Sequence, residues 1–228
     1  MSCIYVLAGT NGAGKSSIAG ATFRSMGADW YDPDEAARAI RSANPGTTLE
    51  QANAAAWREG KRLLERAIAE RLDYVFETTL GGSTITGLLR DAAARGIEVR
   101  VWYAGLASPE LHVARVRARV ARGGHDIPEA TIRKRYDASR QHLIELLPSL
   151  TELRVYDNST DADPADARGD ARPPEPVLVL HVVRGEIVSQ CPPAETPEWA
   201  KPIVAAAMAL APRSARAQSR RRARPLVE

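Results

Sequence analysis

Short runs of apolar and β-branched residues alternate along the chain with stretches whose apolar residues recur at helical spacing. The runs CIYVLAG, DYVFETT, IEVRVWYAGL and LRVYDNS have the composition of strands buried on both faces of a parallel sheet. Between the first two runs, Ala52, Ala56, Leu64 and Ala67 lie on one side of an expected helix that spans residues 48–72. The alternation predicts right-handed βαβ units and an α/β fold with a mostly parallel sheet between two helical layers.

Residues that start and stop helices refine this pattern in two places. Ser108 and Pro109 are typical of the N-cap and first turn of a helix, and the glycines at 123 and 124 are typical of its end. In ADWYDPDEAARAI we expect a short strand to Tyr31, a turn, and then a helix opened by Asp34. A further helix is expected over PEATIRKRYDASRQHLIELLP, before the strand LRVYDNS.

The composition changes after residue 160. The segment DADPADARGDARPPEP is rich in Pro, Asp, Ala and Arg, and it is typical of a linker or mobile loop. Beyond it, VLVLHVVRGEIVSQ predicts a β-hairpin that turns near Arg184-Gly185, and an Ala-rich helix is expected from Trp199 to Leu210. The expected organisation is a core domain over 1–160, a linker or loop over 161–176, a hairpin-and-helix appendage packed on the core over 177–212, and a disordered basic tail over 213–228.

The positive charge is concentrated in that tail. The 228 residues carry a net charge of +3, but residues 213–228 hold six arginines and one glutamate, so the remainder has a net charge of −2. A nearly neutral body gives no reason to expect a globular domain that binds nucleic acid. The two cysteines, Cys3 and Cys191, are far apart, and no apolar run is long enough to cross a membrane. We therefore expect a cytoplasmic protein without a membrane partner.

A glycine-rich motif follows the first strand. Residues 9–16, GTNGAGKS, fit the phosphate-binding pattern G-x-x-x-x-G-K-[ST] between an expected strand and an expected helix. Glycines let backbone N–H groups close around phosphate oxygens, Lys15 reaches the β- and γ-phosphates, and the Ser16 hydroxyl is a ligand for Mg²⁺. The motif predicts a P-loop NTPase fold that binds a nucleoside triphosphate with Mg²⁺. The expected nucleotide-binding residues are Gly9, Asn11, Gly12, Ala13, Gly14, Lys15, Ser16 and Ser17.

Two carboxylates follow expected strands, at the sheet edge where open α/β sheets bind ligands. Asp34 lies in YDPDE and Glu77 ends the strand VFETT. A kinase needs one carboxylate to accept the proton of the acceptor hydroxyl, and it often uses another near the metal. Asp34 is also suited to be a plain N-cap, and Glu77 is suited to bind either metal or substrate.

Arginines supply a third element. Arg115, Arg119 and Arg122 share one face of the expected helix over 108–122, and no acidic residue lies between Arg115 and Gly124. Such a face is suited to close over a triphosphate and neutralise developing charge, and Arg133 and Arg135 on the next helix are placed to join it. A basic, solvated surface helix is the simpler alternative. His125 is a weaker candidate acid or base.

Six segments, in order, resemble the zeta toxin-like family of P-loop kinases, in particular its shorter chromosomal branch. They are AGTNGAGKSS, YDPDEAAR, FETTLGG, RVRARVARGGHDIPE, RKRY and VYDNS, and they cover residues 1–160. The resemblance implies that ATP and Mg²⁺ are the cofactors, with Lys15 and Ser16 as ligands, and that Asp34 is the catalytic base. It also implies a lid formed by Arg119 with a neighbour such as Arg122, and an acceptor site formed by Glu77, Thr78 and Thr79, with Arg115 and Arg135 as further binding residues.

The resemblance further implies an acceptor and a biological role. Known members of the family phosphorylate a hydroxyl of a UDP-activated amino sugar and are toxins paired with antitoxin proteins. We therefore expect an ATP-dependent kinase for a nucleotide-linked sugar similar to UDP-N-acetylglucosamine, with a possible antitoxin partner. Because this chain has Gly81-Gly82 where plasmid-borne members have an arginine, the identity of the acceptor stays open.

Two alternatives share some of these features. A polynucleotide 5′-kinase or a nucleotide kinase would have the same P-loop, base and lid. From another class, a nucleotide-gated module would bind nucleic acid weakly through the tail RSARAQSRRRAR. That tail has no aromatic residues on which bases would stack, so a solubilising role is the simpler interpretation.

Overall fold

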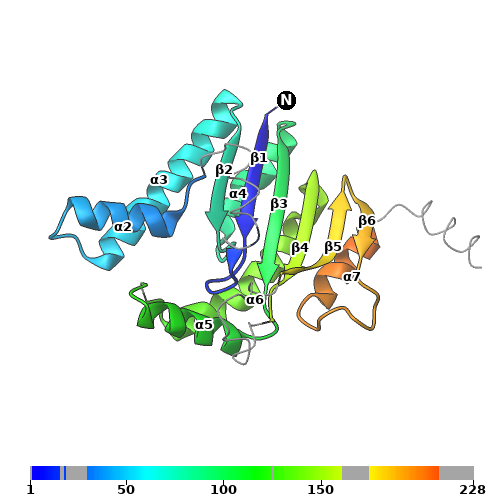
Figure 1. Ribbon diagram of the computed structural model, residues 1–228. Coiled ribbons are helices and arrows are strands. Elements are labelled where there is room, and N and C mark those ends of the chain that lie inside the picture. Colours follow the sequence, from blue (N-terminus) through cyan, green and yellow to red (C-terminus); the bar gives the residue numbers. More distant parts are fainter. Residues whose placement is uncertain (1, 16–17, 19–29, 125, 161–174, 211–228) are drawn as a thin grey trace, which may run out of the picture.

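A six-stranded mixed sheet organises the computed structural model, which describes residues 2–15, 18, 30–124, 126–160 and 175–210. Its strands, in spatial order, are β2 (Tyr74–Thr78), β1 (Cys3–Ala8), β3 (Glu98–Gly105), β4 (Glu152–Asp157), β5 (Val177–Val183) and β6 (Glu186–Gln190). The first four are parallel, and β5 and β6 are antiparallel additions to the same sheet (Figure 1). The predicted α/β fold with a mostly parallel sheet is confirmed.

The helices connect and cover these strands. Those that the structure describes are α2 (Pro33–Ala43), α3 (Leu49–Glu70), α4 (Ser83–Ala94), α5 (Pro109–Ala121), α6 (Glu129–Leu146), the short 3₁₀ turn η1 (Leu147–Ser149) and α7 (Lys201–Leu210). Helices α2 and α3 extend beyond the β2 edge, and α5 lies below the carboxyl ends of the parallel strands in Figure 1. The site described below lies where these two groups of helices approach each other.

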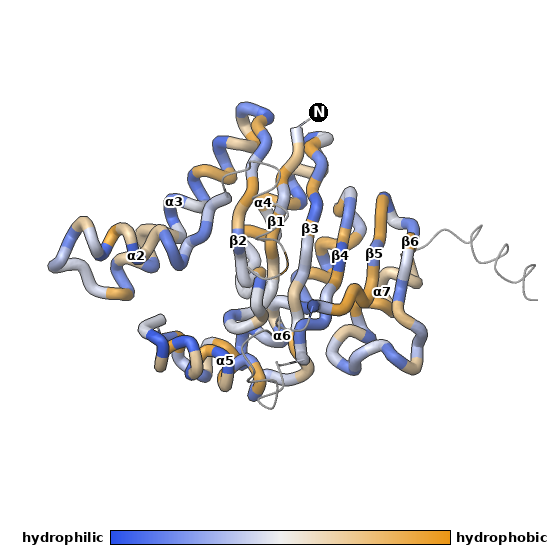
Figure 2. Tube along the Cα trace, viewed as in Figure 1, coloured by the Kyte–Doolittle hydropathy of each residue, from blue (hydrophilic) through white to orange (hydrophobic). Residues whose placement is uncertain are grey.

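The main core lies between one face of the sheet and helices α3, α4, α6 and α7. Ile4 and Val6 of β1, Val101 of β3 and Leu153 of β4 are fully buried there, in contact with apolar residues of the helices. Apolar residues accordingly follow the strands in Figure 2. Burial of this surface is the main source of stability for such a fold.

The opposite face combines a small apolar cluster with a row of charges. Leu7, Val75 and Trp102 are buried together, with Ile18 packed against them. The helix that we expect from about Gly14 to Ser25 falls mostly on residues 16–17 and 19–25, which lie outside the described residues.

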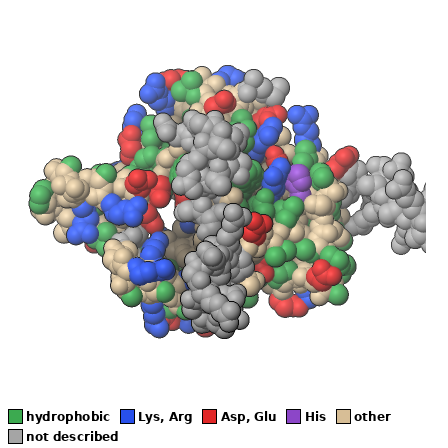
Figure 3. Space-filling view, in the orientation of Figure 1, with side chains coloured by type: hydrophobic (Ala, Val, Ile, Leu, Met, Phe, Trp, Pro, Cys, Tyr) green, Lys and Arg blue, Asp and Glu red, His purple; other side chains and the backbone are tan. Residues whose placement is uncertain are grey.

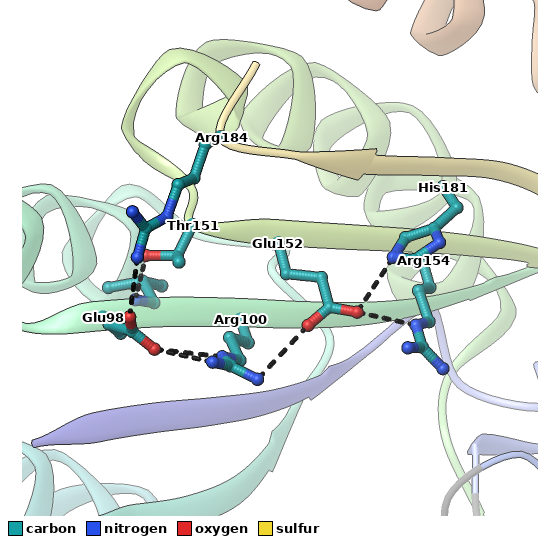
Figure 4. Close-up of polar contacts among 8 residues, drawn as sticks. Glu98, Arg100, Thr151, Glu152, Arg154, His181 and Arg184 are labelled. Atoms are coloured by element: carbon teal, nitrogen blue, oxygen red, sulfur yellow. Dashed lines mark hydrogen bonds and ion pairs between the residues drawn. The ribbon is translucent and has the colours of Figure 1, made fainter. Parts of the chain in front are cut away.

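On the neighbouring strands of that face, charged side chains pair across the sheet (Figure 4). Glu152 accepts hydrogen bonds from Arg154 Nε at 2.7 Å and Arg100 Nη1 at 3.5 Å, and its Oε1 lies 3.0 Å from His181 Nε2. Arg100 also donates to Glu98 at 2.7 Å. Facing charges of opposite sign stabilise a strand register, so this row supports the pairing of β3, β4 and β5.

The start of α2 differs from the prediction. Its N-cap is Asp32, whose Oδ1 accepts from the backbone N of Asp34 at 2.8 Å, and the helix begins at Pro33. The expectation that Asp34 opens the helix was therefore wrong, because Pro33 with its fixed φ suits the first helical position. The expected strand before it is a single β-bridge between Tyr31 and Phe76.

The other predicted boundaries agree more closely. Thr48 and Gln51 form a reciprocal capping box at the start of α3, and Ser108 Oγ accepts from Leu111 N at the start of α5. The hairpin of β5 and β6 turns at Arg184-Gly185, where both φ angles are positive.

The C-terminal elements contact the same core as the first 160 residues. Strand β5 pairs with β4, and Trp199 is buried with its Nε1 donating to Asp157 Oδ1 at 3.0 Å. The division into a core, a linker, an appendage and a basic tail stays a prediction, since residues 161–174 and 211–228 lie outside the described residues. None of the described helices is long and apolar enough to span a membrane.

Candidate active site

The phosphate-binding loop has the geometry that its glycines predict. Gly9, Gly12 and Gly14 all have positive φ angles, of 138°, 83° and 74°. A Cβ on Gly9 would lie 2.3 Å from the carbonyl oxygen of Ala104, so the loop packs directly on the backbone of β3. Lys15 Nζ donates to the Gly9 carbonyl at 3.2 Å, which holds the ammonium group over the loop. Ser16 and Ser17 lie outside the described residues.

Side chains from three distant elements support the loop. His112 Nδ1 lies 2.8 Å from the Asn11 carbonyl oxygen, Arg135 Nη1 donates to Asn11 Oδ1 at 2.8 Å, and Asn158 Nδ2 donates to the Ala13 carbonyl at 2.9 Å. Because a carbonyl oxygen only accepts, His112 carries its proton on Nδ1. Helices α5 and α6 and the segment after β4 are thus tied directly to the loop.

His112 is neutral in this position. It is 1% exposed, and burial lowers its pKa to about 4, with nearby Lys15 and Arg115 adding to the shift and the bond to Asn11 opposing it. The neutral ring avoids the repulsion that a cation at this position would exert on Lys15. No role was predicted for His112, or for Asn158 within VYDNS, because each is more than 100 residues from the loop along the chain.

A cleft of about 380 Å³ opens beside the loop. Its walls are the loop itself, the end of β2 with the turn into α4, the start of α2, the middle of α3, and Ile127 and Arg135 from the region of α6. Charged side chains of both signs gather around the hollow between α2 and α5 in Figure 3. Among its lining residues are Asn11, Lys15, Asp34, Glu77, Thr78, Thr79 and Arg135, all of which the sequence analysis had selected.

Glu77 is the buried carboxylate of the cleft. Its Oε2 lies 3.9 Å from Lys15 Nζ, and its buried Oε1 has no hydrogen-bond partner in the described part of the chain. Burial raises the pKa of Glu77 to about 7; Lys15 opposes this shift, and Asp32 and Asp34 add to it. A carboxyl poised near neutrality with an unused oxygen is typical of a functional position.

Asp34 lies at the mouth of the cleft and contacts the arginine helix. Its Oδ2 lies 3.5 Å from Arg119 Nη1, and each side chain is a little more than one third exposed. The contact joins the start of α2 to the end of α5, so the carboxylate predicted as the base and the arginine predicted for the lid face each other.

The structure separates the other predicted arginines. Arg135 lines the cleft, whereas Arg115 donates to the Thr160 carbonyl at 3.3 Å and Arg122 Nε donates to the Ala118 carbonyl of its own helix at 3.2 Å. Neither Arg115 nor Arg122 lines the cleft. Arg133 points away from it into ion pairs with Glu110 and Glu129. The roles of Arg115 and Arg122 stay predictions, and His125 lies outside the described residues.

Thr78 and Thr79 shape the turn after β2. Thr78 Oγ1 accepts from Leu80 N at 3.1 Å, and Thr79 Oγ1 accepts from Gly81 N at 3.3 Å. These bonds fix a turn that contains Leu80 at a φ of 50°, and His142 Nδ1 lies 2.7 Å from the Leu80 carbonyl. Both threonines therefore line the cleft from a turn whose backbone is fixed by hydrogen bonds.

One wall of the cleft was not predicted from the sequence. Asn53, Trp57 and Lys61 line it from α3. Their spacing of four residues was a usable signal, because it places all three on one side of a helix whose apolar stripe lies elsewhere.

The residues of the loop suit the binding of the ATP phosphates, whereas the described side chains form no cluster of metal ligands. The glycine cradle with its backbone N–H groups and the ammonium of Lys15 are donors that a triphosphate requires. Within the described ranges, no group of three or more His, Cys, Asp or Glu side chains is placed to hold a metal ion. Mg²⁺ in such sites is held chiefly by phosphates, waters and one or two protein oxygens, and the role of Ser16 as its ligand stays a prediction from the motif.

The fold and this site define a P-loop kinase. The zeta toxin family matches residues 2–163, and the chain belongs to that family. An uncharacterized protein of Haemophilus influenzae is 35% identical over 132 residues, which cover 56% of this chain and 88% of that protein.

Solved structures share the fold at low sequence identity. A chain from the AvrRxo1-ORF1:AvrRxo1-ORF2 complex with sulphate ions has a TM-score of 0.65 and 17% identity, covering 89% of this chain and 63% of that chain. The same complex with ATP gives a TM-score of 0.63 and 16% identity, covering 91% and 64%. The PezAT chromosomal toxin–antitoxin system of Streptococcus pneumoniae gives a TM-score of 0.50 and 14% identity, covering 73% and 76%. This chain thus spans less than two thirds of the matched AvrRxo1 chains.

Proposed function

We propose that this protein transfers a phosphoryl group from ATP to a hydroxyl of a small molecule, most specifically a nucleotide-linked sugar similar to UDP-N-acetylglucosamine. The observation that carries the proposal is a single cleft in which Lys15 of the P-loop, Asp34 of α2 and Glu77 of β2 all line the wall. A phosphate-binding ammonium and two carboxylates around one space are the groups that a kinase requires.

The loop and its supports bind and orient the nucleotide. ATP, when bound, supplies the γ-phosphoryl group, and Mg²⁺ neutralises charge on the phosphates. Backbone N–H groups of residues 9–15 and the Lys15 ammonium hold the phosphate oxygens, with Ser16 as the metal ligand. Arg135 is braced by Asn11 at the edge of the loop, where its charge offsets charge that develops during transfer.

Asp34 is the proposed general base. It accepts the proton of the acceptor hydroxyl as that oxygen attacks, because it is the carboxylate at the open side of the cleft. Arg119, 3.5 Å away, holds this carboxylate in place, and it is the proposed lid residue. Glu77 and Thr79 bind the acceptor, with Glu77 Oε1 available to accept a hydrogen bond from it.

We also propose a biological role as the toxin of a toxin–antitoxin pair. The support is membership of the zeta toxin family and the fold shared with the PezAT toxin–antitoxin system. A protein antitoxin is therefore the expected partner.

The test compares acceptors and variants. Purified protein is incubated with labelled ATP, Mg²⁺ and either UDP-N-acetylglucosamine or a 5′-hydroxyl oligonucleotide. Asp34→Asn is expected to lower transfer to the sugar nucleotide about 10²- to 10⁴-fold while ATP affinity stays nearly unchanged. Glu35→Gln is the matched control, since it removes an exposed acid from the same helical turn. Undiminished transfer by Asp34→Asn would refute the base, and labelled oligonucleotide would assign the protein to the polynucleotide kinases.

A further inference from the structure

An exposed tryptophan lines the cleft opposite the phosphate-binding loop. Trp57 is 46% exposed, whereas Trp102 and Trp199 are 9% and 3% exposed. An indole ring that is exposed to solvent contributes little to the stability of the fold. In a concave site, such a ring offers a flat apolar surface for a ligand. Trp57 is therefore a residue whose placement the core does not explain.

The helix that carries Trp57 is firmly held. Ala56, the residue before Trp57, is fully buried and its carbonyl accepts from the Tyr31 hydroxyl at 2.6 Å. A Cβ on Gly60 would lie 2.7 Å from Tyr31 Cε1, so the tyrosine ring packs directly on the helix backbone. These contacts fix the orientation of α3 and present Trp57 to the cleft on a rigid element.

Two neighbours of Trp57 add polar groups at the same spacing. Asn53 precedes it by four residues and Lys61 follows it by four, and all three line the cleft. Neither the Asn53 amide nor the Trp57 indole N–H has a hydrogen-bond partner among the residues that the structure describes, and Lys61 Nζ donates to Glu65 Oε1 at 2.6 Å. An aromatic face, a free amide and an ammonium group together suit a flat heterocycle with a hydrogen-bonding edge and an anionic substituent.

We propose that Trp57 is a specificity-determining residue that stacks on the base of a nucleotide-linked acceptor, with Asn53 reading the edge of the base and Lys61 near its phosphates. This inference rests on the proposed function and deepens it. The reacting hydroxyl lies at the end of the cleft lined by Asp34 and Lys15, and the base lies against α3. Recognition through a remote ring is a common way to position a reacting group, because stacking energy offsets the loss of freedom on binding.

The test measures binding without turnover. Wild-type protein is saturated with a non-hydrolysable ATP analogue and Mg²⁺, so that the P-loop is occupied, and titrated by calorimetry with UDP, CDP, GDP and ADP in turn. Stacking on one base is worth about 1–3 kcal/mol, so Trp57→Ala should weaken the tightest of these by about 5- to 150-fold, and Trp57→Phe should retain most of the affinity. Leu72→Ala is the control, because Leu72 is similarly exposed just beyond α3 and does not line the cleft.

Each outcome decides the proposal. Equal nucleotide affinity of wild type and Trp57→Ala, or no binding of any of the four nucleotides, would overturn it. It would also be overturned if Trp57→Ala lost as much affinity for N-acetylglucosamine 1-phosphate, which has no base, as for the nucleotide. In a transfer assay, Trp57→Ala should raise KM and leave kcat within a few-fold of wild type. If the nucleotide binds through Trp57 but the wild type phosphorylates no acceptor, the proposed function fails and the subsite stands.

Discussion

At the scale of single residues, burial decides what the carboxylates of the cleft do. Asp34 and Glu77 both line the cleft, but Glu77 is 7% exposed whereas the Asp34 side chain is 38% exposed. Burial keeps Glu77 partly protonated near neutral pH, while Asp34 remains accessible to an acceptor hydroxyl. The two residues are therefore suited to different roles, one as a binding group and the other as a base.

The raised pKa of Glu77 predicts a specific effect of pH on stability. The folded protein retains the Glu77 proton up to about pH 7, whereas the unfolded chain loses it near 4.5. Relative to Glu77→Gln, the free energy of unfolding of the wild type should therefore fall as pH rises through this window, by at most about 1.4 kcal/mol per pH unit. Urea denaturation of both proteins at several pH values measures this difference. Parallel curves for the two proteins would show that burial does not shift Glu77.

At the scale of elements, the helix that carries the lid arginine also supports the P-loop. Helix α5 contacts the loop through His112 at one end and contacts Asp34 through Arg119 at the other. A change in the position of α5 must therefore alter both nucleotide binding and the environment of the base. This coupling suits a lid that responds to the nucleotide.

The contact between His112 and the loop predicts a loss of nucleotide affinity on mutation. His112→Ala removes a buried hydrogen bond to the Asn11 carbonyl and leaves that oxygen without its partner, at a cost of about 1–3 kcal/mol. We expect ATP to bind about 5- to 150-fold more weakly, as measured by calorimetry. His181→Ala is the control, since His181 lies in the charge row of β3, β4 and β5. Unchanged ATP affinity in His112→Ala would mean that the loop holds its shape without α5.

Much of this arrangement could be predicted from local sequence signals, and some could not. The P-loop, the caps of α5 and the hairpin turn each depend on residues close in sequence, so their local motifs were sufficient to predict them. The start of α2 was misplaced because Asp32 and Asp34 both suit an N-cap, and only the Pro33 backbone distinguishes them. The roles of His112 and Asn158 were missed because they depend on contacts with residues more than 100 positions away along the chain. Trp57 was missed although its four-residue spacing from Asn53 and Lys61 was visible in the sequence.

At the scale of the whole molecule, the sheet extends past the family match. The zeta toxin family covers residues 2–163, yet β5 pairs with β4, and Trp199 and Ile203 are buried in the main core. Elements after residue 176 thus contribute to the same hydrophobic core that positions the P-loop. We expect the two parts to unfold together.

A single substitution tests this cooperativity. Trp199→Ala removes a buried indole and its hydrogen bond to Asp157, and it should lower the free energy of unfolding by about 3–5 kcal/mol. Circular dichroism and ATP-analogue binding should report one shared transition at a lower denaturant concentration. Val188→Ala on β6, where the side chain is 60% exposed, should change little. Two separate transitions in Trp199→Ala, with ATP binding lost only in the second, would show that the C-terminal elements form an independent unit.

Phosphoryl transfer to a small molecule can be measured without choosing the acceptor in advance. Wild-type protein and Asp34→Asn are each incubated with ¹⁸O-labelled ATP, Mg²⁺ and a bacterial metabolite extract, and mass spectrometry identifies the species that gain one labelled phosphoryl group. We predict a nucleotide-linked sugar that is labelled by the wild type and not by the variant. If ATP binds and no metabolite is labelled, the small-molecule kinase assignment is contradicted.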